Sequence, residues 1–479
     1  MNLQHEVRPN VLQIEQSLTA DSRHTTTNER LSSYLAENHA MTTRVSRRRF
    51  LQHASLAGGA GLVGGYFSAR AVAASRSPNE KLNIAAVGTA NRAMADIRGV
   101  AGENIVALAD VDANYLEAAA HRFPAARKYR DFRVMLEREA EKIDAVVVGT
   151  PDHTHAPAAA MALRLGKPVY CEKPLTHTVY EARLLSRLAK KKKVATQLGT
   201  QIHAGDNYRR VVELVQSGVI GPIKEVHVWS SARYSGVHFT LGMPAPDYLN
   251  WDLWLGPAPQ RPYSEGVHPH RWRNFWDYGN GAIGDFGCHY MDLAHWALKL
   301  RYPTRISAEG PPVDSVATPA WLIVHYEYPA RGDLPPVKLT WYDSGRQPAI
   351  LKSLKTADGK PVRFSSGQLF IGRDGMILSD YSRRVLLPAE KFAHFQPPKP
   401  SIPKSIGHHA EWLRAIRTGA PTTCNFDYSG ALTEAVLLGT VAYRSGETIE
   451  WDGPRFRILN APAAQALLHC EYRKGWTLG

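Results

Sequence analysis

Short apolar runs alternate with helix-patterned segments between residues 81 and 198, and this alternation constrains the fold of the 479-residue chain most. The runs have the length and the β-forming residues of buried strands. Strands that alternate with helices favour a parallel sheet with helices on both faces. The predicted strands are residues 82–87, 105–109, 143–148, 168–171 and 194–198.

After about residue 206 the pattern changes to longer strands with alternating character and long connections. Such strands favour an antiparallel sheet with one packed and one open face. We therefore predict an α/β protein with an N-terminal domain over residues 80–205 and an α+β domain over residues 206–460, which has a large, mostly antiparallel open sheet. Residues 461–479 are predicted to be a C-terminal tail. The open sheet face also favours a homo-oligomer, a dimer or a tetramer.

The first 73 residues differ in character from the rest of the chain. Residues 1–40 are polar without an apolar period, so we predict that they are disordered or precede the true start at Met41. Residues 46–51, Ser-Arg-Arg-Arg-Phe-Leu, resemble a twin-arginine export signal. The apolar stretch that follows is too short and too rich in glycine for a membrane span. We predict a signal peptide over residues 41–73, a periplasmic or otherwise exported protein, and no membrane partner after its removal.

Charge and cysteine content argue against several classes of protein. The formal net charge is +14, which favours anionic ligands through long-range attraction. No cluster of lysine and arginine interleaves with aromatic residues as a nucleic-acid groove requires, so no nucleic-acid partner is predicted. The four cysteines form no Cys-x-x-Cys pair, so neither a zinc ribbon nor a redox motif is supported.

The turn after the first predicted strand has part of a dinucleotide-binding fingerprint. That fingerprint, Gly-x-Gly-x-x-Gly, places backbone N–H groups and a helix N-terminus against a pyrophosphate. Residues 88–93 are Gly-Thr-Ala-Asn-Arg-Ala, so only the first glycine is kept. Asp110 ends the second predicted strand, where a carboxylate accepts hydrogen bonds from ribose hydroxyls and repels a 2′-phosphate. The two features predict a Rossmann domain that prefers NAD to NADP, although Asp110 also suits a helix N-cap.

A second informative stretch runs from Trp272 to Trp296. Asp285, His289 and Asp292 occupy positions i, i+4 and i+7, on one face of a predicted helix. Three interpretations of this face are open. The side chains are structural, with Asp285 as a helix cap; or they bind a metal; or they carry out acid–base catalysis, in which the histidine takes the proton of an alcohol.

The chain resembles the Gfo/Idh/MocA family of oxidoreductases over about residues 81–460. The motifs that carry the resemblance are Ala-Asp-Val-Asp at 109–112, Thr-Pro-Asp-His-Thr-His at 150–155 and Cys-Glu-Lys-Pro-Leu at 171–175. The missing glycines are the main departure from the family. With the fingerprint, the resemblance implies a set of cofactor-binding residues: Gly88, Ala90, Asn91, Arg92, Asp110, Thr150, Pro151, His153, His155, Glu172 and Lys173.

The resemblance also favours the catalytic interpretation, because dehydrogenases of the family have an Asp-x-x-x-His pair that matches Asp285 and His289. Lys173 completes the implied triad, and no metal is predicted. In this scheme His289 takes the proton of a sugar or polyol hydroxyl, Asp285 orients its ring, and Lys173 stabilises the alkoxide while hydride passes to the nicotinamide. The predicted substrate-binding residues are Gln201, Trp272, Arg273 and Asp292, since flat aromatic faces pack against sugar rings.

These features predict an exported NAD(P)-dependent oxidoreductase whose small-molecule partner is a sugar, a polyol or a sugar derivative. Free NAD is scarce outside the cytoplasm, so we expect the cofactor to stay tightly bound between turnovers. Two alternatives are open. One is an NAD-dependent glycosidase with no net redox change, and the other is a sugar-binding protein without catalysis.

Overall fold

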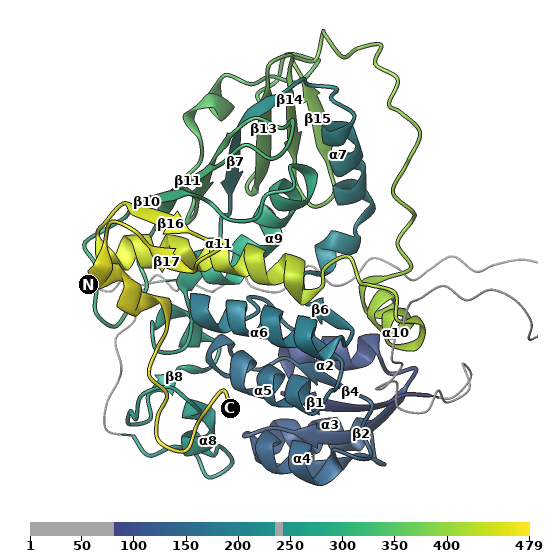
Figure 1. The fold of residues 1–479 in the computed structure, drawn as a ribbon, viewed down its shortest axis with the longest axis vertical. Helices are drawn as coiled ribbons and strands as arrows, with labels where there is room; N and C mark the ends of the chain where they lie inside the picture. Colours follow the sequence, from purple (N-terminus) through teal and green to yellow (C-terminus); the bar gives the residue numbers. More distant parts are fainter. Residues whose placement is uncertain (1–80, 235–242) are drawn as a thin grey trace, which may run out of the picture. The chain divides into compact units, whose positions relative to one another are not determined.

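The computed structural model describes residues 81–234 and 243–479, so the predicted disordered segment and signal peptide lie outside the described residues. Six strands form the N-terminal sheet (Figure 1), in the order β3-β2-β1-β4-β5-β6, and every neighbouring pair is parallel. This sheet confirms the predicted parallel fold. The strands are β1 Asn83–Val87, β2 Asn104–Ala109, β3 Arg127–Tyr129, β4 Ala145–Val148, β5 Val169–Cys171 and β6 Thr196–Leu198.

Helices pack on both faces of this sheet. Helices α2 and α3 share a core with Ile84 and Ala86 of β1, whereas α4, α5 and α6 lie on the face that bears Ala85 and Val87. Asp112 caps α3, because its carboxylate accepts the backbone N–H groups of residues 114 and 115. The alternative that Asp110 is the helix cap is therefore wrong. The bounds are α2 Asn91–Gly99, α3 Ala113–Arg122, α4 Phe132–Glu139, α5 Asp152–Arg164 and α6 Val179–Lys192.

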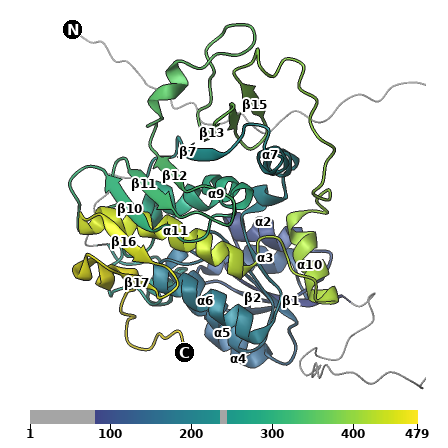
Figure 2. The ribbon, with the colours of Figure 1, turned by 45° about the horizontal axis from the view of Figure 1, so that its top comes forward.

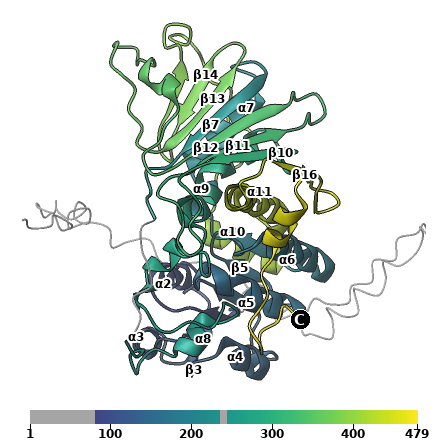
Figure 3. The same ribbon diagram turned by 90° about the vertical axis from the view of Figure 1, so that its left-hand side faces the viewer.

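Nine strands form the C-terminal sheet (Figure 3), in the order β15-β14-β13-β7-β12-β11-β10-β16-β17. The pair β7–β12 is parallel and the other neighbouring pairs are antiparallel. The sheet is therefore mixed, and mostly antiparallel as predicted. The strands are β7 Ile223–Trp229, β10 Arg305–Glu309, β11 Ile323–Tyr328, β12 Val337–Tyr342, β13 Gly367–Gly372, β14 Met376–Ser379, β15 Arg384–Leu387, β16 Ile449–Asp452 and β17 Arg457–Ile458.

Two long helices, α9 (Gly281–Ala297) and α11 (Phe426–Ser445), lie between the two sheets (Figure 3). Helix α11 packs against α6, α9 and β10, and α7 (Asp206–Gln216) packs against α9. Helix α10 (His408–Thr418) returns from the C-terminal half to α2 (Figure 2), so the Rossmann core includes residues from far along the chain. Within the described ranges, no helix is both long enough and apolar enough to cross a membrane.

The connection between β7 and α9 turns back onto the Rossmann domain. Its residues 248–274, here named the covering segment, contain α8 Trp251–Leu255, β8 Glu265–Gly266, β9 His268–Pro269 and η2 Arg271–Asn274. The carbonyl of Tyr248 accepts the N–H of Ala113 (2.8 Å), and the N–H of Asn250 donates to the carbonyl of Val111 (3.0 Å). The covering segment is therefore fixed where β2 leads into α3. Three short 3-10 helices complete the fold: η1 Gln201–Ala204, η3 Ala349–Lys352 and η4 Pro462–Leu468.

Candidate active site

A cavity of about 350 Å³, here named the central cavity, lies at the carboxyl ends of β1, β2, β4 and β5. Open parallel sheets bind ligands at this edge. The turns after these strands form one wall, and the covering segment and α9 form the other. Nine of the predicted cofactor-binding residues line it: Gly88, Ala90, Asn91, Arg92, Asp110, Thr150, Pro151, Glu172 and Lys173.

The turn after β1 explains why one glycine of the fingerprint is kept and another is not. Gly88 has φ +84°, and a Cβ there would lie 2.9 Å from the carbonyl oxygen of Gly149. A Cβ on Gly149 would in turn lie 2.6 Å from the Cβ of Ala93. The third glycine of the fingerprint has no side chain, so the helix can approach the strand. Here the helix residue is Ala93, and the residue without a side chain is Gly149, on the other side of the contact. Ala93 is therefore compatible with a close approach of α2 to the sheet.

Asp110 lies at the cavity wall and braces the turn. Its Oδ2 accepts the backbone N–H (2.8 Å) and the hydroxyl (2.9 Å) of Thr89, and its Oδ1 accepts the N–H of Asp112 (3.0 Å). Burial raises the pKa of this carboxyl. Both oxygens of this carboxyl already accept hydrogen bonds from the protein, so the contact between Asp110 and a ribose hydroxyl stays a prediction.

Lys173 and Asp285 form the ion pair at the centre of the site. The Lys173 Nζ donates to Oδ1 (2.5 Å) and to the carbonyl oxygen (2.7 Å) of Asp285. The Tyr234 hydroxyl donates to Oδ2 (2.7 Å), and the Arg273 Nε lies 3.1 Å from Oδ1. Burial opposes ionisation of Asp285, but the charges of Lys173 and Arg273 outweigh it and hold the pKa well below its usual range. Asp285 is therefore a fixed negative charge.

His289 lines the central cavity but is not oriented by Asp285. Its Nδ1 is buried and has no hydrogen-bond partner among the described residues. The prediction that Asp285 orients the His289 ring is wrong, because the two cations and the tyrosine occupy the carboxylate. Burial, with the nearby charge of Lys173, lowers the pKa of His289 to about 3. The imidazole is therefore neutral at physiological pH.

Glu172 connects the Glu-Lys-Pro motif to the dinucleotide-binding turn. Its Oε1 accepts the Gln201 Nε2 (2.6 Å) and lies 3.2 Å from the Arg92 Nε. A Cβ on Gly199 would lie 2.2 Å from the same oxygen, so this glycine makes room for the carboxylate. Burial is the main cause that raises the pKa of Glu172 to about 8. Glu172 therefore fixes Arg92, and with it the start of α2, to the loop that carries Lys173.

Three predicted site residues do not line the central cavity. Both ring nitrogens of His155 contact backbone carbonyls, of Thr150 (2.7 Å) and Pro174 (2.8 Å), so it joins two loops behind the cavity. The Nε2 of His153 contacts the carbonyl of Trp254 (2.9 Å). Asp292 is fully buried and contacts His203 (3.0 Å) and Tyr428 (2.7 Å).

Asp292 lies away from the cavity because it is seven residues further along α9 than Asp285, and seven residues advance a helix by about 10 Å. The shared helix face was predicted correctly, but its far end lies in the core, so the prediction that Asp292 binds substrate is wrong. The other predicted substrate residues, Gln201, Trp272 and Arg273, do line the central cavity. The Arg273 guanidinium lies 4.0 Å above the Trp272 ring, which holds its direction.

Several residues at the site were not predicted. Asp152 lines the cavity, and burial raises the pKa of its carboxyl to about 8. It stands within the Thr-Pro-Asp-His motif, so its position in that motif was an available signal. Tyr234 contacts Asp285, but it follows β7 in a stretch without a motif, and no sequence signal identified it. At the β2 end, Tyr115 and His268 face each other with ring centroids 5.6 Å apart.

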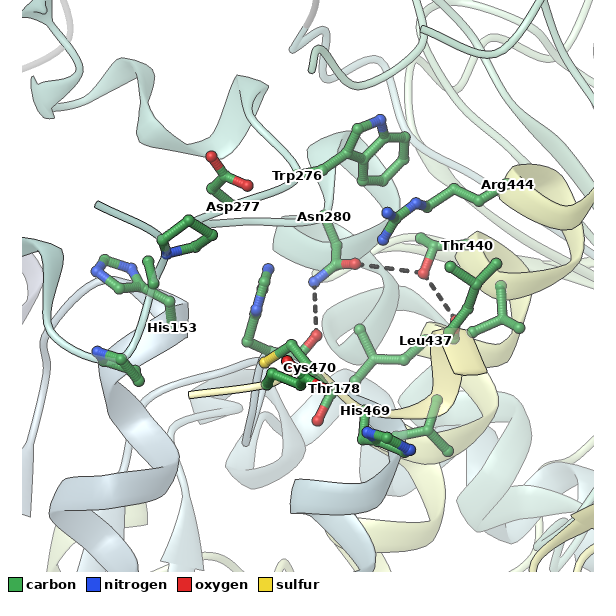
Figure 4. Close-up of a pocket in the computed structure, with 18 of the residues that line it drawn as sticks. His153, Thr178, Trp276, Asp277, Asn280, Leu437, Thr440, Arg444, His469 and Cys470 are labelled. Carbon is green, nitrogen blue, oxygen red and sulfur yellow. Dashed lines mark hydrogen bonds between the residues drawn. The ribbon is translucent and has the colours of Figure 1, made fainter. Parts of the chain in front are cut away.

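His153 points instead to a second cavity of about 320 Å³, behind the first turn of α5 (Figure 4). The Asn280 side chain lines this cavity, where it donates to the carbonyl of His177 (3.0 Å) and accepts the hydroxyl of Thr440 (3.2 Å). Arg444 points toward Asn280 from α11. Asn280 thus connects the loop before α6 to α11, and the second cavity is separate from the predicted chemistry.

One group of described residues has metal-ligand atoms close together: His203, Asp292 and Cys424, within 4.8 Å of one another. This group is buried, and none of its members lines the central cavity. Asp292 already accepts hydrogen bonds from His203 and Tyr428, so the contacts are explained without an ion.

The central cavity fits a dinucleotide. Gly88 leaves the turn after β1 without a side chain, as a pyrophosphate needs, and a methyl group there would also collide with the backbone of Gly149 after β4. Asp110 lies at the end of β2 and Lys173 at the end of β5, on opposite sides of that turn. These residues would hold the ribose and nicotinamide ends of NAD, respectively.

Models of one protein family match both parts of the chain. The oxidoreductase family Gfo/Idh/MocA, NAD-binding Rossmann fold, matches residues 60–200, and its C-terminal alpha/beta domain matches residues 205–334. Inositol 2-dehydrogenase 1 of Saccharopolyspora erythraea is 34% identical over 143 residues, which are 29% of this chain and 42% of that protein. The chain spans about half the length, or less, of the curated relatives it matches.

Solved structures share the fold at low identity. The WlbA dehydrogenase from Bordetella pertussis, in complex with NADH and UDP-GlcNAcA, is 17% identical with a TM-score of 0.54, over 78% of this chain and 99% of that one. The aldose-aldose oxidoreductase from Caulobacter crescentus, complexed with glycerol, is 17% identical with a TM-score of 0.50, over 78% and 100%.

Proposed function

Because the chain belongs to the Gfo/Idh/MocA family of NAD-binding oxidoreductases, we propose that it oxidises an alcohol group of a sugar, a polyol or a sugar derivative. The observation that carries the proposal is the central cavity, in which the dinucleotide-binding turn at Gly88 and the Lys173–Asp285 pair share one space. The similarity to an inositol 2-dehydrogenase supports a carbohydrate-like substrate. NAD, when bound, accepts the hydride.

Lys173 is suited to hold the reacting oxygen. An ammonium group has three N–H donors, and Asp285 accepts two of them, one at Oδ1 and one at its carbonyl oxygen. No hydrogen bond to another described residue uses the third, which is therefore suited to a substrate hydroxyl in the cavity. Because Asp285 is a fixed charge, it keeps the ammonium group in place, and the bond from Lys173 strengthens as negative charge develops on the substrate oxygen.

His289 is suited to take the proton. It lines the same cavity, and because its pKa is lowered to about 3 it is neutral, and so able to accept a proton, at physiological pH. Trp272 and Arg273 form an adjacent wall with a flat aromatic surface and a cation, which suits the C–H face and the hydroxyls of a sugar.

We further propose that the enzyme is exported and retains its cofactor. The twin-arginine-like sequence at residues 46–51 supports export. The covering segment supports retention, because Leu253, Trp254 and His268 form a wall of the cavity opposite the dinucleotide-binding turn. A retained cofactor requires that each oxidation is followed by a reduction at the same site. We also expect a homo-oligomer.

A glycosidase with no net redox change is the second candidate. Elimination of an aglycone next to an oxidised carbon needs a base for a C–H proton and an acid for the leaving group. Asp152 favours this candidate, because it is a further carboxyl in the cavity and its pKa of about 8 keeps it protonated at neutral pH.

Two measurements test the proposal. The purified mature protein is denatured with acid and the supernatant is assayed for nicotinamide, and one NAD per chain is expected. Matched substrates, such as myo-inositol, glucose and p-nitrophenyl glucoside, are then followed by NADH absorbance and nitrophenol release. Up to one equivalent of bound NADH per chain without nitrophenol supports the oxidoreductase, and nitrophenol without net NADH supports the glycosidase. A protein that neither contains nor binds NAD contradicts both.

A further inference from the structure

The last residues of the chain leave the C-terminal domain and run back to the Rossmann domain. After η4, residues 473–479, here named the strap, reach α8 and the start of α4 (Figures 1 and 3). These two elements belong to different walls of the central cavity, since Leu253 and Trp254 of α8 and Phe132 of α4 all line it. The strap therefore connects two elements that belong to different walls of the cavity.

Arg473 holds the wall that α8 forms. Its guanidinium donates to the carbonyl oxygens of Asp252 (2.7 Å) and Gly256 (3.1 Å), to the side chain of Gln260 (2.6 Å) and to the carboxylate of Asp252. Its backbone N–H donates to the carbonyl of Pro257 (3.0 Å). The side chain is 16% exposed. One arginine thus fixes both the last turn of α8 and the loop after it.

Trp476 holds the opposite wall. Its ring centroid lies 5.9 Å from that of Phe132, and the Arg133 guanidinium carbon lies 4.1 Å from the ring centre. Arg133 also donates to the carbonyl of Gly475 (3.1 Å), and Arg164 donates to the carbonyl of Gly479 (2.5 Å). Phe132 therefore has the cavity on one side and the strap on the other.

The wall that Arg473 supports is connected to the cofactor side by further contacts. The Trp254 indole donates to His268 (3.2 Å), and His268 contacts the carboxylate of Asp112 (3.0 Å), which caps α3. A displacement of α8 therefore disturbs the surroundings of Asp110 as well as the wall itself. No residue of the strap lines the central cavity, so its effect on a bound molecule is indirect.

From this arrangement we propose that the strap holds the central cavity closed over NAD, and that Arg473 and Trp476 are positioning residues that slow its release. The proposal rests on the proposed function, in which the cofactor is retained. A ligand enclosed between two walls leaves only when they separate, and here separation requires that the strap detaches from α8 or from α4. Without the strap, the walls separate with fewer broken contacts, so the release rate rises.

The test measures release of NADH from the mature protein by fluorescence, with excess NAD added as the chase. Arg473→Ala and Trp476→Ala are each expected to release NADH at least tenfold faster than the wild type. Arg473→Lys keeps the charge but loses the planar guanidinium group, so it should release NADH faster than the wild type and more slowly than Arg473→Ala. Arg455→Ala is the matched control, because that side chain is 82% exposed and pairs with Asp452, away from the strap, and its rate should equal that of the wild type.

The thermal midpoint of the NAD-free proteins separates positioning from folding. The proposal requires faster release with a midpoint within a few degrees of the wild type. Unchanged release in both alanine variants overturns it, as does faster release in Arg455→Ala. The assay uses added NADH, so it measures the effect of the strap on NADH release even if no sugar is oxidised. A protein that binds NADH but oxidises no sugar would contradict the proposed function alone. A wild type that binds no NADH overturns both.

Discussion

Replacing Asp285 by asparagine removes the negative charge that Lys173 and Arg273 share, while the size of the side chain hardly changes. The side chains of Lys173 and Asp285 are 10% and 9% exposed, so solvent screens the pair only weakly. Removing one partner of a buried ion pair costs about 3–5 kcal/mol, because the other charge is left without compensation. The asparagine oxygen can still accept one hydrogen bond, so we expect the lower end, about 3 kcal/mol of unfolding free energy.

The matched control is Asp427→Asn. Asp427 pairs with Arg301 in a comparable geometry (2.8 Å), but the two side chains are 57% and 46% exposed. Exposed pairs contribute about 1 kcal/mol or less. Urea unfolding of the NAD-free proteins, followed by tryptophan fluorescence, measures both variants against the wild type. Equal losses in the two variants would refute the reasoning, because burial would then have no effect on the value of the pair.

The acid dependence of stability gives a second readout of the same pair. The pKa of Asp285 is lowered in the folded protein, so the contribution of the pair is fully present above the unfolded value of about 3.9. It is lost as the pH falls toward the folded pKa. Asp285→Asn should therefore lack this part of the stability loss below about pH 4. A variant with the acid dependence of the wild type would contradict the assignment.

Three further predictions concern turnover and the cofactor. Lys173→Ala and His289→Ala should each lower kcat at least a hundredfold while nicotinamide content stays near that of the wild type, and an unchanged kcat in either variant would refute its role. Gly88→Ala should abolish NAD binding, because Gly88 has a positive φ and a Cβ there would collide with the backbone of Gly149. Gly102→Ala is the control and should bind NAD normally, because Gly102 has open space around it. Equal NAD binding by the two variants would refute the role of Gly88 in the dinucleotide-binding turn. Because the pKa of His289 is lowered to about 3, its protonation should not reduce kcat between pH 5 and 7, and a kinetic pKa near 6.5 assigned to it by substitution would contradict this.

The dinucleotide-binding turn shows how a motif can depart from its pattern and keep its geometry. Read along the chain, Ala93 is a lost glycine. In the fold, the contact that the glycine would serve is made with Gly149, 56 positions later, which has no side chain either. A close contact between two residues needs only one of them to be small. A motif that covers only one of the two segments therefore cannot show that the small residue lies on the other.

The sequence by itself determined the parallel sheet, the mostly antiparallel second sheet and the wall of the cavity that follows the strands. These features depend on local patterns: apolar runs of strand length, and residues placed directly after a strand, such as Asp110 and Lys173. Local order also fixed that Asp285 and His289 share a helix face, because a helix repeats within a few residues.

Only the tertiary structure decided which partners these side chains have. Asp285 contacts Lys173, Arg273 and Tyr234 from distant segments, rather than His289 four residues along its own helix. Asp292 shares the helix face but lies two turns deeper, in the core. Most of the covering segment and the whole strap carry no motif, and their places beside the cavity follow from long-range packing rather than from local periodicity. A charged side chain pairs with an opposite charge that the fold places beside it, and the spacing of residues along the chain does not predict that partner.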